Sequence, residues 1–267
     1  METSSGEGTS WARLSTLILC FACAWQLVFW LLQRTSWLQP PHQPELGTLC
    51  CLKAVNMLHA LVCGPAATWV LLASPTVGPV TRAVLRLDVG VLGAPASFGA
   101  YDARVPWVVA LTVGFFLFDV VNVRTWESVD PLMVAHHLLS ITVWPIAVHY
   151  RVAYVYLLIF ISSELSSPLL QGRWMARTFS GKDSKAFKSV TMLFGLSFLC
   201  VRSWTIPFVE FALWVMKPWA YAAIPRWVNV LATATLPLPA VLNALWTVQI
   251  IQMALRKPKK DAQQKAS

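Results

Sequence analysis

The strongest constraint on the fold is a series of apolar runs, each about as long as a helix needs to cross a bilayer. A spanning helix takes about 20 mostly apolar residues, because the lipid interior offers no water to its peptide groups. The runs are too long and continuous for strands of a membrane barrel. We therefore expect an all-α, polytopic membrane helix bundle of about seven transmembrane helices. The spans are expected at about 14–32, 52–73, 105–123, 132–149, 153–170, 190–215 and 228–255.

Composition supports a membrane protein and argues against a nucleic-acid partner. Only 12% of the residues are charged, against about 25% in soluble domains. The 14 tryptophans fit a protein with two membrane interfaces, where this side chain is enriched. The net charge of +9 lies between the apolar runs and at the C-terminus, without the interleaved aromatic residues of a nucleic-acid surface.

Lysine and arginine in short loops predict the orientation, because they concentrate on the cytosolic side. The loop 171–188 and the tail 256–260 are both basic and are separated by two predicted spans, so both are expected in the cytosol. The C-terminus is then cytosolic. The segment 74–106, broken by proline and glycine, is expected to be a loop with a short interfacial helix near 80–89. Its Arg82, Arg86 and Arg104 oppose this orientation.

Several ionisable residues interrupt the apolar runs, where such groups usually mark a site or a paired contact. At 1.5 Å per residue, each lies roughly 6–12 Å from the predicted cytosolic end of its span. We therefore expect them at a common depth in the cytosolic half of the membrane. These residues are His59, Asp119, the adjacent His136 and His137, and Glu164.

Polar neighbours share helix faces with these groups. Ser140 follows His136 by four residues, Asn56 precedes His59 by three, and Ser163 adjoins Glu164. Imidazole acts as a general base or nucleophile, and a carboxylate orients it. The candidate catalytic residues are therefore His136, His137, Asp119 and Glu164. The candidate substrate-binding residues are His59, Asn56, Ser140, Ser163 and Arg202.

A structural role is the alternative for each of these residues, since hydrogen bonds between polar side chains also hold membrane helices together. Arg202, with Glu210 later in the same span, also fits a structural or headgroup-facing charge. Adjacent histidines diverge by about 100° around a helix. We therefore expect one imidazole to face a cavity and the other a neighbouring helix, and we expect no metal site. No nucleotide-binding or hydrolase motif indicates a cofactor.

The ordered motifs of the chain resemble the TLC domain, the membrane domain of the TRAM, Lag and CLN proteins. They are "NMLHAL", "LTVGFFLFDVV", "DPLMVAHHLLSI", "SSELSSPLLQGRW" and "VRSWTIP". The similarity is greatest to the small TLC domain-containing transmembrane proteins. It implies an N-terminal segment with the first span at 1–48, a TLC domain at 49–256 and a basic cytosolic tail at 257–267. It also implies a multi-pass protein of the endoplasmic reticulum or another endomembrane, with membrane lipids as partners.

The ceramide synthases of this family join fatty acyl-CoA to a lipid amine. Their motif begins with a histidine pair, which His136 and His137 match, and continues with acidic residues. Here the corresponding stretch reads "LIFISSELSS", in which only Glu164 matches. Two interpretations follow. The favoured one is a protein of membrane lipid homeostasis that binds or regulates lipids in a cavity open to the cytosolic leaflet. The alternative is an N-acyltransferase with a histidine-pair active site and acyl-CoA as co-substrate.

Overall fold

A computed structural model describes residues 10–40, 43–86, 101–203, 224–235 and 237–255. Within these residues every regular element is a helix, which confirms the expected fold class. The α-helices are α1 (Trp11–Gln33), α2 (Gly47–Ala73), α3 (Val77–Leu85), α6 (Val105–Val121), α7 (Pro131–His149), α8 (Tyr154–Ser162), α9 (Ser167–Ser180), α10 (Lys185–Arg202), α12 (Arg226–Thr235) and α13 (Leu238–Leu255). Short 3₁₀ helices are η1 (Pro44–Leu46), η2 (Val123–Thr125) and η3 (Ser163–Ser166).

Four stretches in the described part of the chain are long and apolar enough to cross a membrane. They are Trp11–Gln33, Pro44–Ala73, Pro131–His149 and Arg226–Met253, and α6 is a shorter apolar helix. The count of seven spans stays a prediction. Residues 204–215 of the sixth expected span, Glu210 and the basic tail 257–267 lie outside the described residues.

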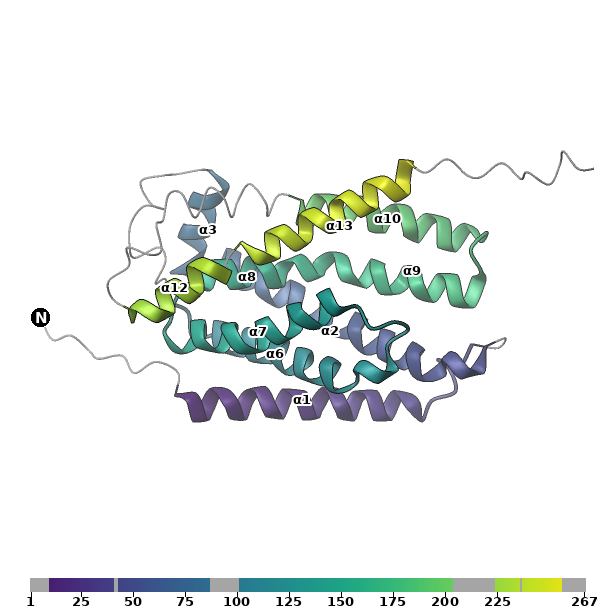
Figure 1. The fold of residues 1–267 in the computed structure, drawn as a ribbon, viewed down its shortest axis with the longest axis horizontal. Helices are drawn as coiled ribbons and strands as arrows, with labels where there is room; N and C mark the ends of the chain where they lie inside the picture. Colours follow the sequence, from purple (N-terminus) through teal and green to yellow (C-terminus); the bar gives the residue numbers. More distant parts are fainter. Residues whose placement is uncertain (1–9, 41–42, 87–100, 204–223, 236, 256–267) are drawn as a thin grey trace, which may run out of the picture.

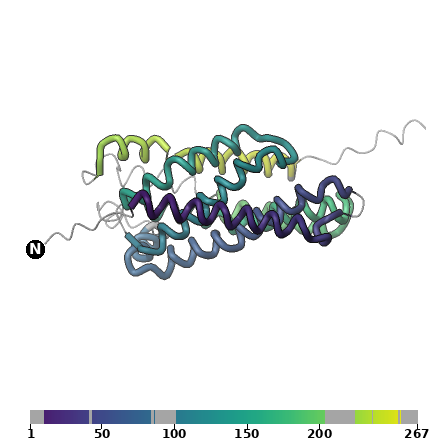
Figure 2. Tube along the Cα trace, turned by 90° about the horizontal axis from the view of Figure 1, so that it is seen from below, coloured from purple at the N-terminus to yellow at the C-terminus, as the bar shows by residue number. Residues whose placement is uncertain are grey.

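The helices run side by side along one long axis (Figure 1). The α9–α10 turn, the α6–α7 connection and the α1–α2 connection lie towards one end, on the right in Figure 1. We call this the α9–α10 end. Viewed from below, α1 crosses the front of the molecule, with α2 on one side of it (Figure 2). Helix α8 is central, since all nine of its residues are buried.

Helix starts follow capping signals in the sequence. The side chain of Ser10 accepts from the backbone N–H of Arg13 at 3.2 Å, and Asp130 accepts from that of Leu132 at 2.9 Å. Ser184 accepts from the N–H of Phe187 at 3.1 Å. Each of these oxygens satisfies a donor that the first turn of a helix leaves free.

One expected loop is shorter than predicted. The loop 171–188 is wrong, because α9 continues to Ser180 and α10 begins at Lys185. Gly181, with φ of 81°, ends α9 in a conformation that other residues rarely adopt. The expected interfacial helix corresponds to α3 at Val77–Leu85, and residues 87–100 lie outside the described part. The last expected span divides into α12 and α13, with Pro237 and Pro239 beside the start of α13.

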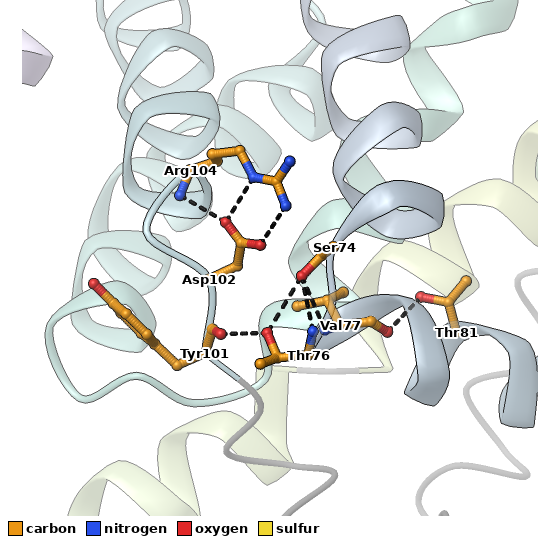
Figure 3. A network of polar contacts seen from close by, with 7 residues as sticks. All are labelled: Ser74, Thr76, Val77, Thr81, Tyr101, Asp102 and Arg104. Carbon is orange, nitrogen blue, oxygen red and sulfur yellow. Dashed lines mark hydrogen bonds and ion pairs between the residues drawn. The ribbon is translucent and has the colours of Figure 1, made fainter.

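A polar network joins the end of α2 to the start of α6 (Figure 3). Ser74 Oγ caps α3 by accepting from the N–H of Val77 at 3.0 Å, and the hydroxyl of Thr76 donates to the carbonyl of Tyr101. Asp102 accepts from Arg104 Nε at 2.9 Å and Nη2 at 2.6 Å. The Arg104 guanidinium therefore holds the pKa of the Asp102 carboxyl well below its usual range.

Helix α1 packs against α6 at very short range. A Cβ on Gly114 would lie 2.8 Å from the carbonyl oxygen of Ile18 and 2.8 Å from Phe21 Cβ. Trp25 Nε1 donates to the carbonyl of Leu111 at 3.3 Å, farther along the same interface. Backbone contact of this kind is typical of membrane helices with small residues between them. The first helix is therefore part of the bundle.

Candidate functional site

A cavity of about 420 Å³ lies between α2, α6 and α7 on one wall and η3, α9, α10 and α13 on the other. It brings together seven of the nine candidate residues, which come from five separate elements. They are Asn56, His59, Asp119, His136, His137, Glu164 and Arg202. The aliphatic and aromatic parts of its wall include Leu52, Phe115, Phe116, Met133, Leu170, Phe194, Phe198, Trp246, Ile250 and Met253.

Glu164 reaches this cavity from η3, a 3₁₀ turn between α8 and α9. Pro168 has no N–H to donate to the carbonyl of Glu164, so an α-helix is weakened at this point. The hydroxyl of Ser163 donates to the carbonyl of Phe160 at 2.6 Å, and that of Ser166 donates to the carbonyl of Ser163 at 3.0 Å. These hydroxyls are therefore bonded to nearby backbone carbonyls in and beside the turn that presents Glu164.

Arg202 is the hub of the wall formed by η3, α10 and α13. Its Nη2 lies 3.4 Å from Glu164 Oε1. Its Nε donates to Ser166 Oγ at 2.9 Å and its Nη2 to Ser167 Oγ at 3.0 Å. The guanidinium also lies 5.9 Å from the centroid of the Trp246 ring. Arg202 is thus fixed in the cavity wall as the counter-charge of Glu164, which excludes the outward, headgroup-facing placement considered from the sequence.

His137 and Asp119 face each other on the opposite wall. His137 Nδ1 lies 3.3 Å from Asp119 Oδ2, and both side chains are more than nine-tenths buried. The imidazole stacks on the ring of Phe116, with centroids 4.5 Å apart. Neither His137 Nδ1 nor Asp119 Oδ1 has an aligned hydrogen bond to a described residue. A carboxylate beside an imidazole in this arrangement suits an orienting or proton-holding role.

Both histidines of the pair line the cavity, and His137 also faces a neighbouring helix, α6, as expected for one of the two. His136 lines the cavity and meets the ring of Trp246 edge to face, with centroids 6.5 Å apart. His137 meets Phe116 and Asp119. Adjacent residues diverge by about 100° around a helix. His136 therefore meets Trp246 of α13, whereas His137 meets Asp119 of α6.

His59 and Asn56 occupy the α2 side of the same wall. The His59 ring stacks on Phe115 at 3.8 Å between centroids and is 1% exposed. Its Nε2 has no hydrogen-bond partner among the described residues, and neither has Asn56 Oδ1. Buried polar atoms are usually bonded, so these atoms mark a place where a polar ligand fits.

Ser140 and Ser163 do not line this cavity. The hydroxyl of Ser140 donates to the carbonyl of His136 at 2.9 Å and is used within its own helix. Ser163 borders a separate, mainly apolar pocket of about 30 Å³, which also touches His136, Glu164 and Arg202. Both serines lie next to candidate cavity residues, as expected from the sequence. Their hydroxyls are bonded to nearby backbone carbonyls, however, and so offer little to a ligand.

The cavity also contains polar residues that the sequence did not single out. At the α9–α10 end its lining includes the exposed Glu127, Ser128 and Asp130 of the α6–α7 connection, so it opens there. Lys53 and Arg173 line it from α2 and α9. Lys53 precedes Asn56 by three residues, a helical spacing that could have identified it. No comparable signal marks the α6–α7 connection.

In the described part of the chain, no three histidine, cysteine or acidic side chains are arranged to hold a metal ion. The cavity groups are instead paired across helices, His137 with Asp119 and Glu164 with Arg202. The arrangement suits recognition of a polar group, or proton transfer to it, by side chains alone.

Replacing Gly64 by alanine is expected to displace Glu164. A Cβ at Gly64 of α2 would lie 2.9 Å from the backbone nitrogen of Leu165, which has no flexible end to move aside. Overpacking of this kind typically costs about 1–3 kcal/mol. We expect a lower melting temperature in detergent and a loss of bound ligand. Gly172→Ala on α9 is the control, because its nearest contact would be an ordinary 3.7 Å. Equal stability of the two variants would contradict the close α2–η3 contact.

Comparison with known proteins gives one family match. The family model described as the TLC domain matches residues 50–252, which include the whole cavity lining except Met253. No solved structure matches the chain.

Proposed function

Because this chain belongs to the TLC-domain family of lipid-related membrane proteins, we propose that it binds a membrane lipid in the cavity and acts in membrane lipid homeostasis. The observation that carries the proposal is the polarity of the cavity wall. Ionisable groups from η3, α6, α7 and α10 share one cavity with phenylalanines and aliphatic side chains. An amphiphile matches such a wall, since its chain covers the apolar part and its polar group meets the charges.

We further propose that the cavity opens to the cytosolic leaflet. Its exposed lining lies at the α9–α10 end, where Arg177, Lys182, Lys185 and Lys188 also lie on and beside the α9–α10 turn. Such a concentration of positive charge favours the cytosolic side. The same orientation places the C-terminus in the cytosol. The endoplasmic reticulum or another endomembrane is the proposed location and follows from the family alone.

A cavity-filling substitution tests lipid binding. Leu170→Trp adds a large ring to a residue of the cavity lining. We expect lipid retained through purification in mild detergent, measured by native mass spectrometry, to fall about tenfold, which corresponds to ~1.4 kcal/mol of binding free energy. Leu193→Trp is the control, because Leu193 is exposed on α10 and does not line the cavity. The proposal is wrong if the wild-type protein retains no lipid, or if both variants retain it equally.

The second candidate is an acyl-CoA-dependent N-acyltransferase, and the contact between His137 and Asp119 favours it. One imidazole of the pair would take the proton of a lipid amine as its nitrogen attacks the thioester carbonyl. The C–S bond then breaks, and the thiolate leaves and is protonated. Asp119 and Glu164 would orient and stabilise the imidazolium ions.

The two candidates differ in a His136→Ala, His137→Ala double variant. If the protein transfers acyl groups, the purified wild type converts acyl-CoA and a lipid amine to an amide. The rate of this reaction should be at least about 100-fold lower in the double variant. Lipidomics of cells restored with each form should show the same loss. A lipidome that is identical for wild type and double variant excludes catalysis by these residues.

A further inference from the structure

The mouth of the cavity carries charges of both signs. Glu127 and Asp130 come from the α6–α7 connection, whereas Lys53 comes from α2 and Arg173 from α9. All four side chains line the one cavity. In the described part of the chain, none of the four is in an ion pair with another residue. Their charges therefore remain available to groups of opposite sign on a ligand.

Neutral partners hold these charges in place. Trp174 Nε1 donates to Glu127 Oε2 at 2.8 Å, and the Lys53 ammonium lies 5.8 Å from the centroid of the same indole ring. Asp130 uses Oδ1 to cap α7. Arg173 Nε donates to Thr191 Oγ1 at 3.1 Å, which leaves its two terminal nitrogens for another acceptor. Each charged group thus has an uncharged contact that orients it.

Deeper in the cavity, buried polar atoms point to a ligand that continues inward. Asp119 Oδ1 and His59 Nε2 lack hydrogen-bond partners among the described residues, and both residues are more than nine-tenths buried. The lining also contains Phe194, Phe198 and Ile250, which provide apolar surface. A ligand with a charged head, further polar atoms and an apolar chain matches this combination.

From this arrangement we propose that the mouth is a binding site for a zwitterionic lipid headgroup, with its phosphate at Lys53 and Arg173 and its ammonium group at Glu127 and Asp130. The inference rests on the proposed lipid-binding function and names the lipid class. A guanidinium binds a phosphate through two parallel hydrogen bonds, and a lysine adds a point charge. An ammonium group two carbons from the phosphate then lies beside the carboxylates.

The same charges discriminate against other lipids. An anionic headgroup without an amine would satisfy Lys53 and Arg173 but leave two carboxylates without a counter-charge. A free fatty acid would do the same. Covering an unpaired charge removes its water without compensation, so the mismatch weakens binding. Trp126 lines the mouth and Trp174 contacts Glu127, and tryptophan is enriched at the depth of lipid headgroups.

The test uses the purified full-length protein and three lipids with identical acyl chains, namely phosphatidylethanolamine, phosphatidylcholine and phosphatidylglycerol. Binding is measured by native mass spectrometry in mild detergent. We expect the wild type to bind the two zwitterionic lipids at least about tenfold more tightly than phosphatidylglycerol. A Glu127→Gln, Asp130→Asn double variant should bring the three affinities to within about twofold. Both substitutions keep an acceptor for Trp174 or for the α7 cap, so folding is preserved.

A Lys53→Met, Arg173→Gln double variant should weaken all three lipids, because each carries a phosphate. Asp183→Asn is the matched control, since this acid lies in the α9–α10 turn at the same end but does not line the cavity. Equal binding of phosphatidylglycerol by the wild type, or an unchanged preference in the Glu127, Asp130 variant, would overturn the headgroup assignment alone. Failure of the wild type to bind any of the lipids would overturn the proposed function as well.

Discussion

Replacing Arg202 by methionine is expected to destabilise the bundle by about 3 kcal/mol or more, because it leaves the Glu164 carboxylate largely buried without its counter-charge. The side chains of Arg202 and Glu164 are 11% and 20% exposed, so water screens the pair only weakly. The substitution also removes the donors to Ser166 and Ser167, which attach α10 to η3 and the start of α9. Thermal unfolding in detergent and retained lipid should both decrease.

A double variant separates charge from packing. Arg202→Met with Glu164→Gln removes both charges and should recover much of the lost stability, since an uncharged pair has no buried ion to solvate. Arg177→Met is the control, because Arg177 is exposed on α9 and outside the cavity. If the double variant is as unstable as Arg202→Met alone, the ion pair is not the source of the effect.

Gly114→Ala is expected to separate α1 from α6 and to lower stability by about 2–3 kcal/mol. The added methyl group would meet two backbone atoms, the carbonyl oxygen of Ile18 and the nitrogen of Ala22, at 2.8 and 2.9 Å. Backbone cannot rotate away, so the whole helix must move. The bonds from Trp25 to Leu111 and from Asn122 to Gln26 would be lost as α1 shifts.

The expected result is a lower melting temperature together with faster proteolysis in or beside α1. Gly195→Ala is the matched control, since it lies inside α10 and its Cβ would come no closer than 4.0 Å to Ile250. Alanine raises helix propensity by about 1 kcal/mol, so this control should be neutral or slightly stabilising. A Gly114→Ala protein as stable as this control would show that α1 is not held at this glycine.

The apolar runs predicted the class of fold because the bilayer leaves few alternatives to a helix of span length. The division between α12 and α13 has a similarly local cause, because Pro237 and Pro239 interrupt helical hydrogen bonding there. The prediction of a loop at 171–188 was wrong because the apolar pattern ends there, whereas the helices do not. Helices α9 and α10 continue in polar sequence, and a hydropathy pattern marks the membrane boundary rather than the helix end.

The candidate site was predictable to the extent that it depended on depth. Span position placed His59, Asp119, His137 and Glu164 at similar levels, and the cavity contains all four. Their roles as catalytic or binding residues stay predictions. Which wall each residue faces depended on helix packing, and so did the pairing of Arg202 with Glu164.

The sequence by itself determined that the chain forms a helical membrane bundle with ionisable groups near one depth, because burial in lipid is so unfavourable for such groups that few placements are allowed. Only the tertiary structure decided how these groups combine. Pairing requires specific faces of non-adjacent helices to meet, as α6 and α7 do at Asp119 and His137. The charged mouth likewise depends on bringing α2, α9 and the α6–α7 connection together, and no local pattern encodes that contact.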